Sequence, residues 1–201
     1  MNILTAIYRR RSIRDFQDKP VPRELLEKLV DAATQAPSAE NEQPWHFTVV
    51  EDRVIKKQIG EISVSAGQKY FGPKKGDLLK KFAGMGQERC TQMVERFTSG
   101  SLFAYLGTAP ALIVVACEDD FFNYAATGAT IQNLMLAALE FKLSTCWAVI
   151  GLTNKADAAA IARLARVPKG QVMIGVIAVG YAAQEPKPRG RKSVEEISTW
   201  I

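Results

Sequence analysis

Apolar residues recur every three or four positions in several segments of the chain, which is the spacing of one face of an α-helix. These segments lie at 3–10, 22–36, 55–62, 90–97, 131–139 and 154–165. Pro22 suits the first turn of the second segment and Pro37 ends it, while Pro168 follows the last one. Residues 131–139 carry the strongest stripe, so we expect a central helix there.

Four other segments have the pattern of strands. Residues 45–50 are rich in aromatic and β-branched side chains, and 109–116 form a continuous apolar run of strand length. Residues 145–150 and 172–179 have the same character. Helices and strands are mixed without strict alternation, which predicts an α+β fold with helices packed over a sheet. No repeat or linker divides the chain, so we expect a single domain over 1–201.

Residues 66–87 break this pattern. They hold six glycine or proline residues and several lysines, which predicts a mobile, basic, lid-like insertion. Residues 181–201 follow the last expected strand and begin with a stretch rich in proline, lysine and arginine, which predicts a C-terminal tail.

The composition fits a globular protein better than a disordered, membrane or secreted chain. The 201 residues are 47% hydrophobic and 23% charged. The basic group at 9–11 follows the first apolar stretch, whereas a secretory signal has the opposite order. No apolar run is long enough for a membrane-spanning helix. We therefore expect a cytoplasmic protein.

Cysteine and histidine are scarce. Cys90, Cys117 and Cys146 form no C-x-x-C pair, which argues against a disulfide framework, a zinc site or an iron–sulfur site. We expect the three thiols to be buried as small apolar groups. His46, the single histidine, lies in a predicted strand and is expected to be structural.

The formal net charge is +5 and the isoelectric point is about 9.1. Basic residues gather at 9–14, 69–81 and 187–192, and aromatic residues are not interleaved with them as stacking platforms for single-stranded nucleic acid. We therefore rank nucleic acid below a phosphorylated cofactor. A nucleic-acid-binding module would instead show a steeply salt-dependent affinity.

Three segments have side chains suited to such a cofactor. Four arginines and a serine lie within 9–14, where guanidinium forks could bind phosphate or simply form a solvated helix end. The loop at 36–45 is dense in small polar groups that could bind a heterocycle edge or satisfy their own backbone. The basic stretch at 187–192 could close on the same phosphate or be a solvated tail.

Together these motifs resemble the FMN-dependent nitroreductase family. The motifs are R-R-S-x-R-x-F at 10–16, A-P-S-x-x-N-x-Q-P-W at 36–45, and a late strand ending in Gly-Tyr followed by K-P-R at 187–189. Their order and spacing extend the similarity over nearly the whole chain. The resemblance implies an α+β sheet covered by helices, in an intertwined homodimer with two FMN molecules at the subunit interface.

The resemblance also assigns roles to residues. The FMN phosphate and ribityl chain would be held by Arg10, Arg11, Ser12 and Arg14, with Lys187 and Arg189 reaching the phosphate from the tail. The other subunit would contact the flavin through Pro37, Ser38 and Asn41. The isoalloxazine ring would lie along Ala148, Val149, Ile150 and Gly151, although many family members have glutamate where Ile150 stands. Gln68 and Lys69 match a family Asn and Lys only loosely.

The implied activity is hydride transfer from NADH or NADPH to flavin N5 and then to a nitroaromatic, quinone or related small-molecule acceptor, by a ping-pong scheme. The flavin carries the chemistry, so no catalytic side chain and no metal are expected. Nearby positive charge and backbone N–H groups would stabilise the reduced flavin. The alternatives are a relative that dehalogenates iodotyrosine, fragments FMN or oxidises peptide-bound rings, or a non-catalytic flavin- or phosphate-binding protein. Neither nucleic acid nor membrane is expected as a partner.

Overall fold

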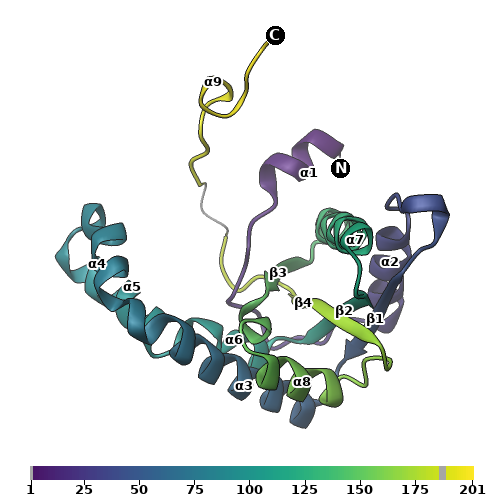
Figure 1. Cartoon of the computed structure of the whole chain (residues 1–201), viewed down its shortest axis with the longest axis horizontal. Coiled ribbons are helices and arrows are strands. Elements are labelled where there is room, and N and C mark those ends of the chain that lie inside the picture. Colours follow the sequence, from purple (N-terminus) through teal and green to yellow (C-terminus); the bar gives the residue numbers. More distant parts are fainter. Residues whose placement is uncertain (1, 186–188) are drawn as a thin grey trace.

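An antiparallel sheet lies at the centre of the chain, whose residues 2–185 and 189–201 are described by a computed structural model (Figure 1). The strands are β1 (Trp45–Val50), β2 (Ala111–Glu118), β3 (Ser144–Ala148) and β4 (Gln171–Gly180), in the spatial order β1-β2-β4-β3. β1 and β3 are therefore the two edges of the sheet. The expected strands are all present, although Ile150 lies beyond the end of β3 in a 3₁₀ turn, η5 (Ile150–Leu152).

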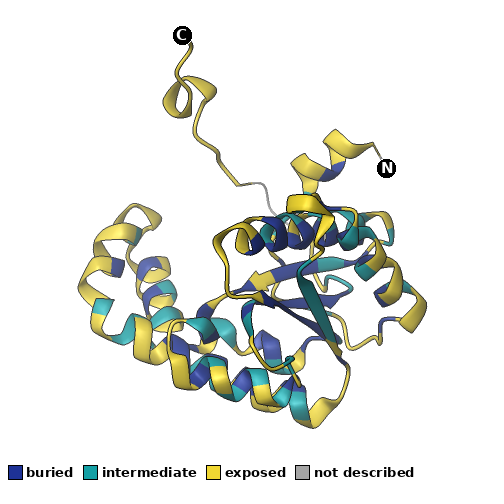
Figure 2. Ribbon diagram, turned by 45° about the vertical axis from the view of Figure 1, so that its right-hand side comes forward, coloured by how far each residue is buried: buried dark blue, intermediate teal, exposed yellow. Residues whose placement is uncertain are grey.

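Helices cover both faces of this sheet. α2 (Arg23–Thr34) and α7 (Phe121–Glu140) pack together on one face, and α3 (Arg53–Phe71), α6 (Tyr105–Thr108) and α8 (Lys155–Leu164) lie on the other (Figures 1 and 2). The predicted α+β architecture and the central helix at 131–139 are confirmed. α6 is only four residues long, too short for a periodic apolar pattern to reveal it.

The apolar run of β2 explains why the sheet is buried on both faces. Side chains alternate along a strand, so Ile113 and Val115 join the core beneath α2 and α7, whereas Leu112 and Val114 join the core beneath α3 and α8. Every residue from Ala111 to Cys117 is buried. A strand covered on both sides has no polar face, which is why its sequence is continuous rather than alternating.

The contact between α3 and α6 depends on two glycines. A Cβ added to Gly60 of α3 would lie only 2.6 Å from the Cα of Gly107 in α6. No side chain larger than hydrogen fits this approach, so the two helices meet backbone to backbone. α6 is thereby held firmly against α3 at the point where Tyr105 begins it.

Residues 66–87 are helical where the sequence pattern indicated a mobile insertion. α3 continues to Phe71, and η2 (Gly72–Lys74), α4 (Lys75–Phe82) and η3 (Ala83–Met85) follow before α5 (Gln87–Thr98). Most of the glycines and the proline of this segment mark the junctions between these short helices. Leu78, Cys90 and Val94 form a small core of their own, packed against the rings of Phe71, Phe82 and Phe97. The α4–α5 hairpin stands away from the sheet (Figure 1); its role as a lid stays a prediction.

The two ends of the described chain project from the body (Figures 1 and 2). α1 (Ile3–Arg9) buries only Ala6, and the tail carries a short helix, α9 (Val194–Ile197), with no buried residue. Both expose large apolar side chains: Ile3, Leu4, Ile7 and Tyr8 in α1, and Val194, Ile197, Trp200 and Ile201 in the tail. Among the described residues, no helix is both long and apolar enough to cross a membrane.

Candidate functional site

The arginine motif runs alongside the edge strand β3. The backbone N–H of Ile13 donates to the carbonyl of Thr145 at 3.0 Å, and Ser12 forms an isolated parallel bridge with Thr145. Ile13 is buried beneath this contact, whereas Ser12 and Arg14 are exposed. Because side chains alternate along extended backbone, Ser12 and Arg14 emerge on the same side of the segment. The structure thus brings two of the predicted residues together beside β3.

Positive charge is concentrated just before this bridge. Arg10 is half-buried, and its pKa is lowered by burial and then by the neighbouring guanidinium groups of Arg11 and Arg191. Arg11 donates through Nη1 to the carbonyls of Tyr8 and Arg10, both at 2.7 Å, and so caps the end of α1. Its Nε is buried without a hydrogen-bond partner. Within the described part of the chain, none of the ion pairs includes these three arginines.

Arg14 lies over a buried tyrosine. Its Cζ is 5.8 Å from the centroid of the Tyr105 ring. The Tyr105 hydroxyl lies 3.2 Å from Sγ of Cys146 in β3 and donates to it. Burial, with Cys146 beside it, raises the pKa of Tyr105 far above its ordinary value, so the phenol keeps its proton. Tyr105 was not predicted as a site residue.

The turn after β3 offers one side chain to a ligand. Ala148 and Ile150 are buried, and Gly151 packs against Ile161 so closely that a Cβ would lie 2.4 Å from Cδ1 of that isoleucine. Val149 alone among the four expected residues is exposed, at 51%. A planar ring lying along this turn would therefore touch Val149 and backbone atoms, and the Ile150 side chain would face the core.

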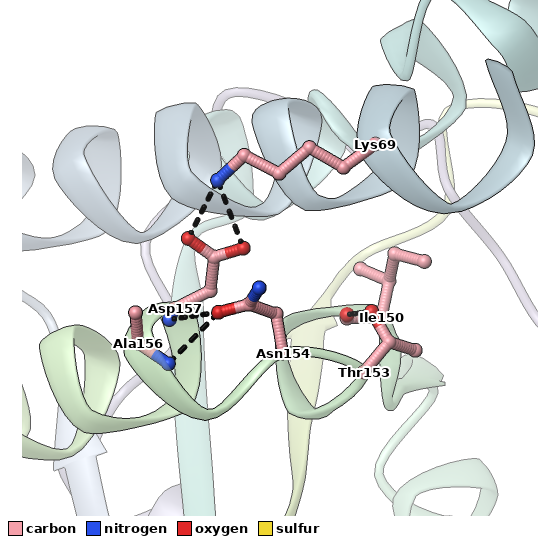
Figure 3. A network of polar contacts seen from close by, with 6 residues as sticks. All are labelled: Lys69, Ile150, Thr153, Asn154, Ala156 and Asp157. Carbon is pink, nitrogen blue, oxygen red and sulfur yellow. Dashed lines mark hydrogen bonds and ion pairs between the residues drawn. The ribbon is translucent and has the colours of Figure 1, made fainter.

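A polar network supports this turn from beneath (Figure 3). Lys69 of α3 binds both carboxylate oxygens of Asp157 in α8, at 3.0 and 3.2 Å. Asn154 caps α8 by accepting from the N–H groups of Ala156 and Asp157. Thr153 donates to the carbonyl of Ile150 at 2.7 Å. Lys69, a loose candidate for a flavin contact, is thus engaged by Asp157 in this structure.

The loop before β1 lies at the opposite edge of the sheet. β2 and β4 separate β1 from β3, so the two edges are about 14 Å apart at the usual strand spacing. Pro37 and Asn41 are exposed, and the loop bonds mainly to itself: Ser38 Oγ accepts from the N–H of Gln43 at 3.1 Å. The structure does not bring Pro37, Ser38 and Asn41 to the arginine motif within one chain.

This loop is also unusual in its backbone. Glu40, Asn41 and Gln43 all have positive φ values, of 48°, 60° and 51°. Each such residue costs free energy, because its Cβ crowds the backbone in the left-handed region. Strained residues gather at binding sites more often than elsewhere. The loop therefore has a more strained backbone than a simple connection between α2 and β1 needs.

The remaining residues singled out from the sequence are the tail residues, the cysteines and the histidine. Arg189 is exposed in the tail, and Lys187 lies outside the described residues. The prediction that Cys90, Cys117 and Cys146 are buried free thiols is confirmed. His46 is half-buried on β1. No cluster of three metal-binding side chains occurs in residues 2–185 and 189–201.

One surface groove lies away from these motifs. It has a volume of about 840 Å³ and lies along α3 and α6, where Lys56, Gly60 and Gly107 are among its lining residues. Its lining mixes acidic and basic side chains. Lys56 already donates to the carbonyls of Ala109 and Pro110 at 2.8 and 2.6 Å. We give the motif residues more weight than this surface groove, because their positive charges gather in one place and Nε of Arg11 is buried there without a partner.

Comparison with known proteins decides the family. Residues 7–181 match the model of the nitroreductase family. The chain belongs to the nitroreductase family. It is 31% identical over 195 residues to a Methanothermobacter thermautotrophicus protein provisionally named NADH dehydrogenase/NAD(P)H nitroreductase, covering 94% of this chain and 82% of that relative.

Solved structures of other nitroreductase-like proteins share its fold. The FMN- and NADPH-dependent nitroreductase NfnB of Sphigopyxis sp. strain HMH superposes with a TM-score of 0.77 at 22% identity, covering 100% of this chain and 99% of that one. An oxidised iodotyrosine deiodinase bound to FMN and 3-iodo-L-tyrosine gives the same TM-score, identity and coverage. At this identity the two structures support the fold.

Sequence reasoning did not single out two residues that lie beside the arginine motif. Tyr105 lies in no motif, and its contacts with Arg14 and Cys146 join parts of the chain that are far apart in sequence. Arg191 was seen within the basic stretch but was passed over in favour of Lys187 and Arg189. Its proximity to Arg10 depends on the path of the tail, which the local pattern does not specify.

Proposed function

We propose that this protein is an FMN-dependent oxidoreductase that transfers reducing equivalents from NADH or NADPH to a nitroaromatic, quinone or related acceptor. The observation that carries the proposal is the cluster of Arg10, Arg11 and Arg191, where positive charges gather without an ion-pair partner among the described residues. Like charges repel, so such a cluster is costly unless an anion neutralises it. A phosphate monoester carries nearly two negative charges and fits that requirement.

The donors present fit the phosphate and sugar-alcohol parts of FMN. Arg10 and Arg14 present guanidinium groups, Ser12 presents a hydroxyl on the same side as Arg14, and Nε of Arg11 is buried and unpartnered. An unpartnered buried donor is costly, and an anion oxygen would satisfy it. In the tail, Arg191 is the residue that the electrostatics favour, and Arg189 and Lys187 remain predicted contacts.

A second copy of the chain supplies the rest of the proposed site. Pro37, Ser38 and Asn41 lie on the far edge of the sheet from the arginine motif, so they can meet the same cofactor only from another subunit. α1 and the tail expose apolar side chains that a partner subunit would cover. These features support the intertwined homodimer, with each site built from both subunits.

FMN would supply the hydride chemistry, and the protein would supply binding, orientation and electrostatics. Val149 and the backbone of residues 148–151 would form a flat apolar wall along the ring. Asn41, held at a positive φ, would present its amide to polar atoms of the ring edge. The concentrated positive charge would favour binding of a second anionic ligand, such as the nicotinamide dinucleotide, near the same place. In this proposal, no side chain of the protein acts as a general acid or base.

The iodotyrosine deiodinase structure gives a second candidate, reductive dehalogenation of an iodinated tyrosine. Its fold matches this chain over the full length, as that of NfnB does. The two activities differ in the acceptor. Menadione, a nitroaromatic and 3-iodotyrosine can therefore be compared as acceptors with one preparation of the FMN-loaded, reduced protein.

The test is an absorption spectrum followed by steady-state kinetics. We expect the purified protein to bind one FMN per chain and to oxidise NADH or NADPH with parallel double-reciprocal lines when menadione is varied. Intersecting lines would require a complex of both substrates and contradict the shared-site scheme. Failure to bind added FMN would refute the proposed function and favour another anion at the arginine cluster.

A further inference from the structure

Tyr105 joins three parts of the molecule. It begins α6, which the Gly60–Gly107 contact fixes against α3. Its hydroxyl donates to Cys146 in the edge strand β3 at 3.2 Å. Arg14, from the motif that runs beside β3, lies over its ring, with Cζ 5.8 Å from the centroid. Only 7% of Tyr105 is exposed, so solvent hardly competes for these contacts.

We propose that Tyr105 is a positioning residue, which fixes the guanidinium of Arg14 for the cofactor by joining it to Cys146; this inference rests on the proposed function. The guanidinium of Arg14 lies over the face of the Tyr105 ring, and the phenol O–H donates to the Cys146 sulfur. The hydroxyl thus anchors the ring, and the face of the ring attracts the cation.

The Arg14 side chain would gain order from such a contact. Its side chain is exposed, and no ion pair in the described residues includes it. A free arginine side chain has many rotamers, and restricting it on ligand binding costs up to about 2 kcal/mol of conformational free energy. Stacking over a fixed ring removes part of that freedom before the ligand arrives. Pre-organisation of this kind strengthens binding without adding a contact to the ligand.

The phenol is suited to this role across the working pH range. Burial and the nearby Cys146 keep Tyr105 protonated, so its O–H remains a donor to sulfur. Cys146 is fully buried in β3, between Thr145, which pairs with the arginine motif, and Trp147. The same short strand therefore holds the motif backbone through Thr145 and the Arg14 side chain through Cys146 and Tyr105.

A double-mutant cycle on FMN affinity tests the inference. The variants are Tyr105→Phe, Arg14→Ala and the two together, with dissociation constants taken from quenching of FMN fluorescence. Tyr105→Phe keeps the ring and removes the hydroxyl. We expect it to weaken FMN binding about 2- to 12-fold in the wild-type background, the range for one neutral hydrogen bond. In the Arg14→Ala background the same change should have almost no effect, because the side chain it positions is gone.

Two controls separate positioning from folding. Tyr181→Phe is the matched substitution, because Lys19 lies 4.2 Å from the Tyr181 ring centroid in a similar cation–ring pair outside the arginine motif; FMN affinity should not change. Cys146→Ser keeps an acceptor for the phenol and should bind FMN as the wild type does, whereas Cys146→Ala should resemble Tyr105→Phe. The cysteine variants also test the idea if Tyr105→Phe does not fold.

The outcomes are distinct. An equal loss of affinity from Tyr105→Phe with and without Arg14, or equal behaviour of the Cys146→Ser and Cys146→Ala variants, overturns the positioning role while FMN binding by the wild type stands. A wild-type chain that binds no FMN refutes the proposed function and this inference with it.

Discussion

The two edges of the sheet are built in opposite ways. The β3 edge is engaged by its own chain: Ile13 bonds to Thr145, and Tyr105 reaches both Arg14 and Cys146. The β1 edge is preceded by a loop that bonds mainly to itself and holds Glu40, Asn41 and Gln43 at positive φ. One edge is thus held by contacts within the chain, whereas the other is preceded by a loop whose shape its own contacts and backbone set.

The difference shows which half of the proposed site a single chain can form. Phosphate recognition needs converging charges, and the fold brings Arg10, Arg11 and Arg191 together within one subunit. Recognition of the ring edge is assigned to a loop that cannot reach that cluster across β2 and β4. The dimer is therefore part of the binding site in this account, and changes at the two edges should have different signatures.

The largest expected effect is at the β3 edge. Arg14→Ala should weaken FMN binding by about 1.5–3 kcal/mol, or roughly 10- to 150-fold, the range for a hydrogen bond to a charged group. Arg9→Ala is the control, since Arg9 lies in the last turn of α1, outside the matched motif. Fluorescence titration measures both. Equal losses at the two positions would indicate a diffuse basic patch in place of a formed phosphate site.

Substitution of Asn41, in the loop before β1, should change stability through backbone strain. Asn41→Ala keeps a Cβ at φ 60° but loses the polar amide that lets asparagine tolerate the left-handed region. We therefore expect about 1–2 kcal/mol of lost stability in thermal or urea unfolding. Asn41→Gly relieves the strain and should be as stable as the wild type or more so. Both variants should bind FMN more weakly, because both lack the amide. If Asn41→Gly binds FMN normally, the amide does not contact the flavin.

Alkaline pH probes the buried phenol of the β3 edge. The folded pKa of Tyr105 is raised, so its stabilising contribution is complete below the unfolded value of 10.0 and is lost as the pH rises above it. One such group changes the unfolding free energy by at most about 1.4 kcal/mol per pH unit. Tyr105→Phe should therefore reduce the loss of stability between pH 10 and 11. An unchanged slope would show that Tyr105 ionises freely in the folded state.

The smallest effect concerns the ion pair beneath the turn after β3. The Lys69 side chain is 56% exposed, so solvent screens its attraction for Asp157. Lys69→Ala should lower stability by less than about 1 kcal/mol. Lys57→Ala is a matched control, because Lys57 pairs with Glu61 on the surface of the same helix. A much larger loss from Lys69→Ala in thermal unfolding would show that the pair anchors α3 to α8.

Local patterns predicted the elements well and the spatial contacts less well. Trp45–Val50 matches its expected strand because β-branched and aromatic residues dominate it, and 131–139 lies within α7 because its apolar stripe is long. Local pattern did not reveal the short helices within 66–87, because the glycines and the proline of this segment mark the junctions between them. Tyr105 was missed because the contacts that define it, with Arg14 and Cys146, arise only after folding.

Subunit mixing tests the central claim, that each site takes Arg14 from one subunit and Ser38 and Asn41 from the other. At an FMN concentration low enough to be limiting, Arg14→Ala and the double variant Ser38→Ala/Asn41→Ala are each expected to bind too little FMN to be active. Refolded together in equal amounts, about half of the dimers should be mixed, each with one intact site of two. About a quarter of wild-type FMN binding and activity should return. If mixed dimers form and neither returns, while each variant refolded alone is also inactive, the site is not shared between subunits in this way.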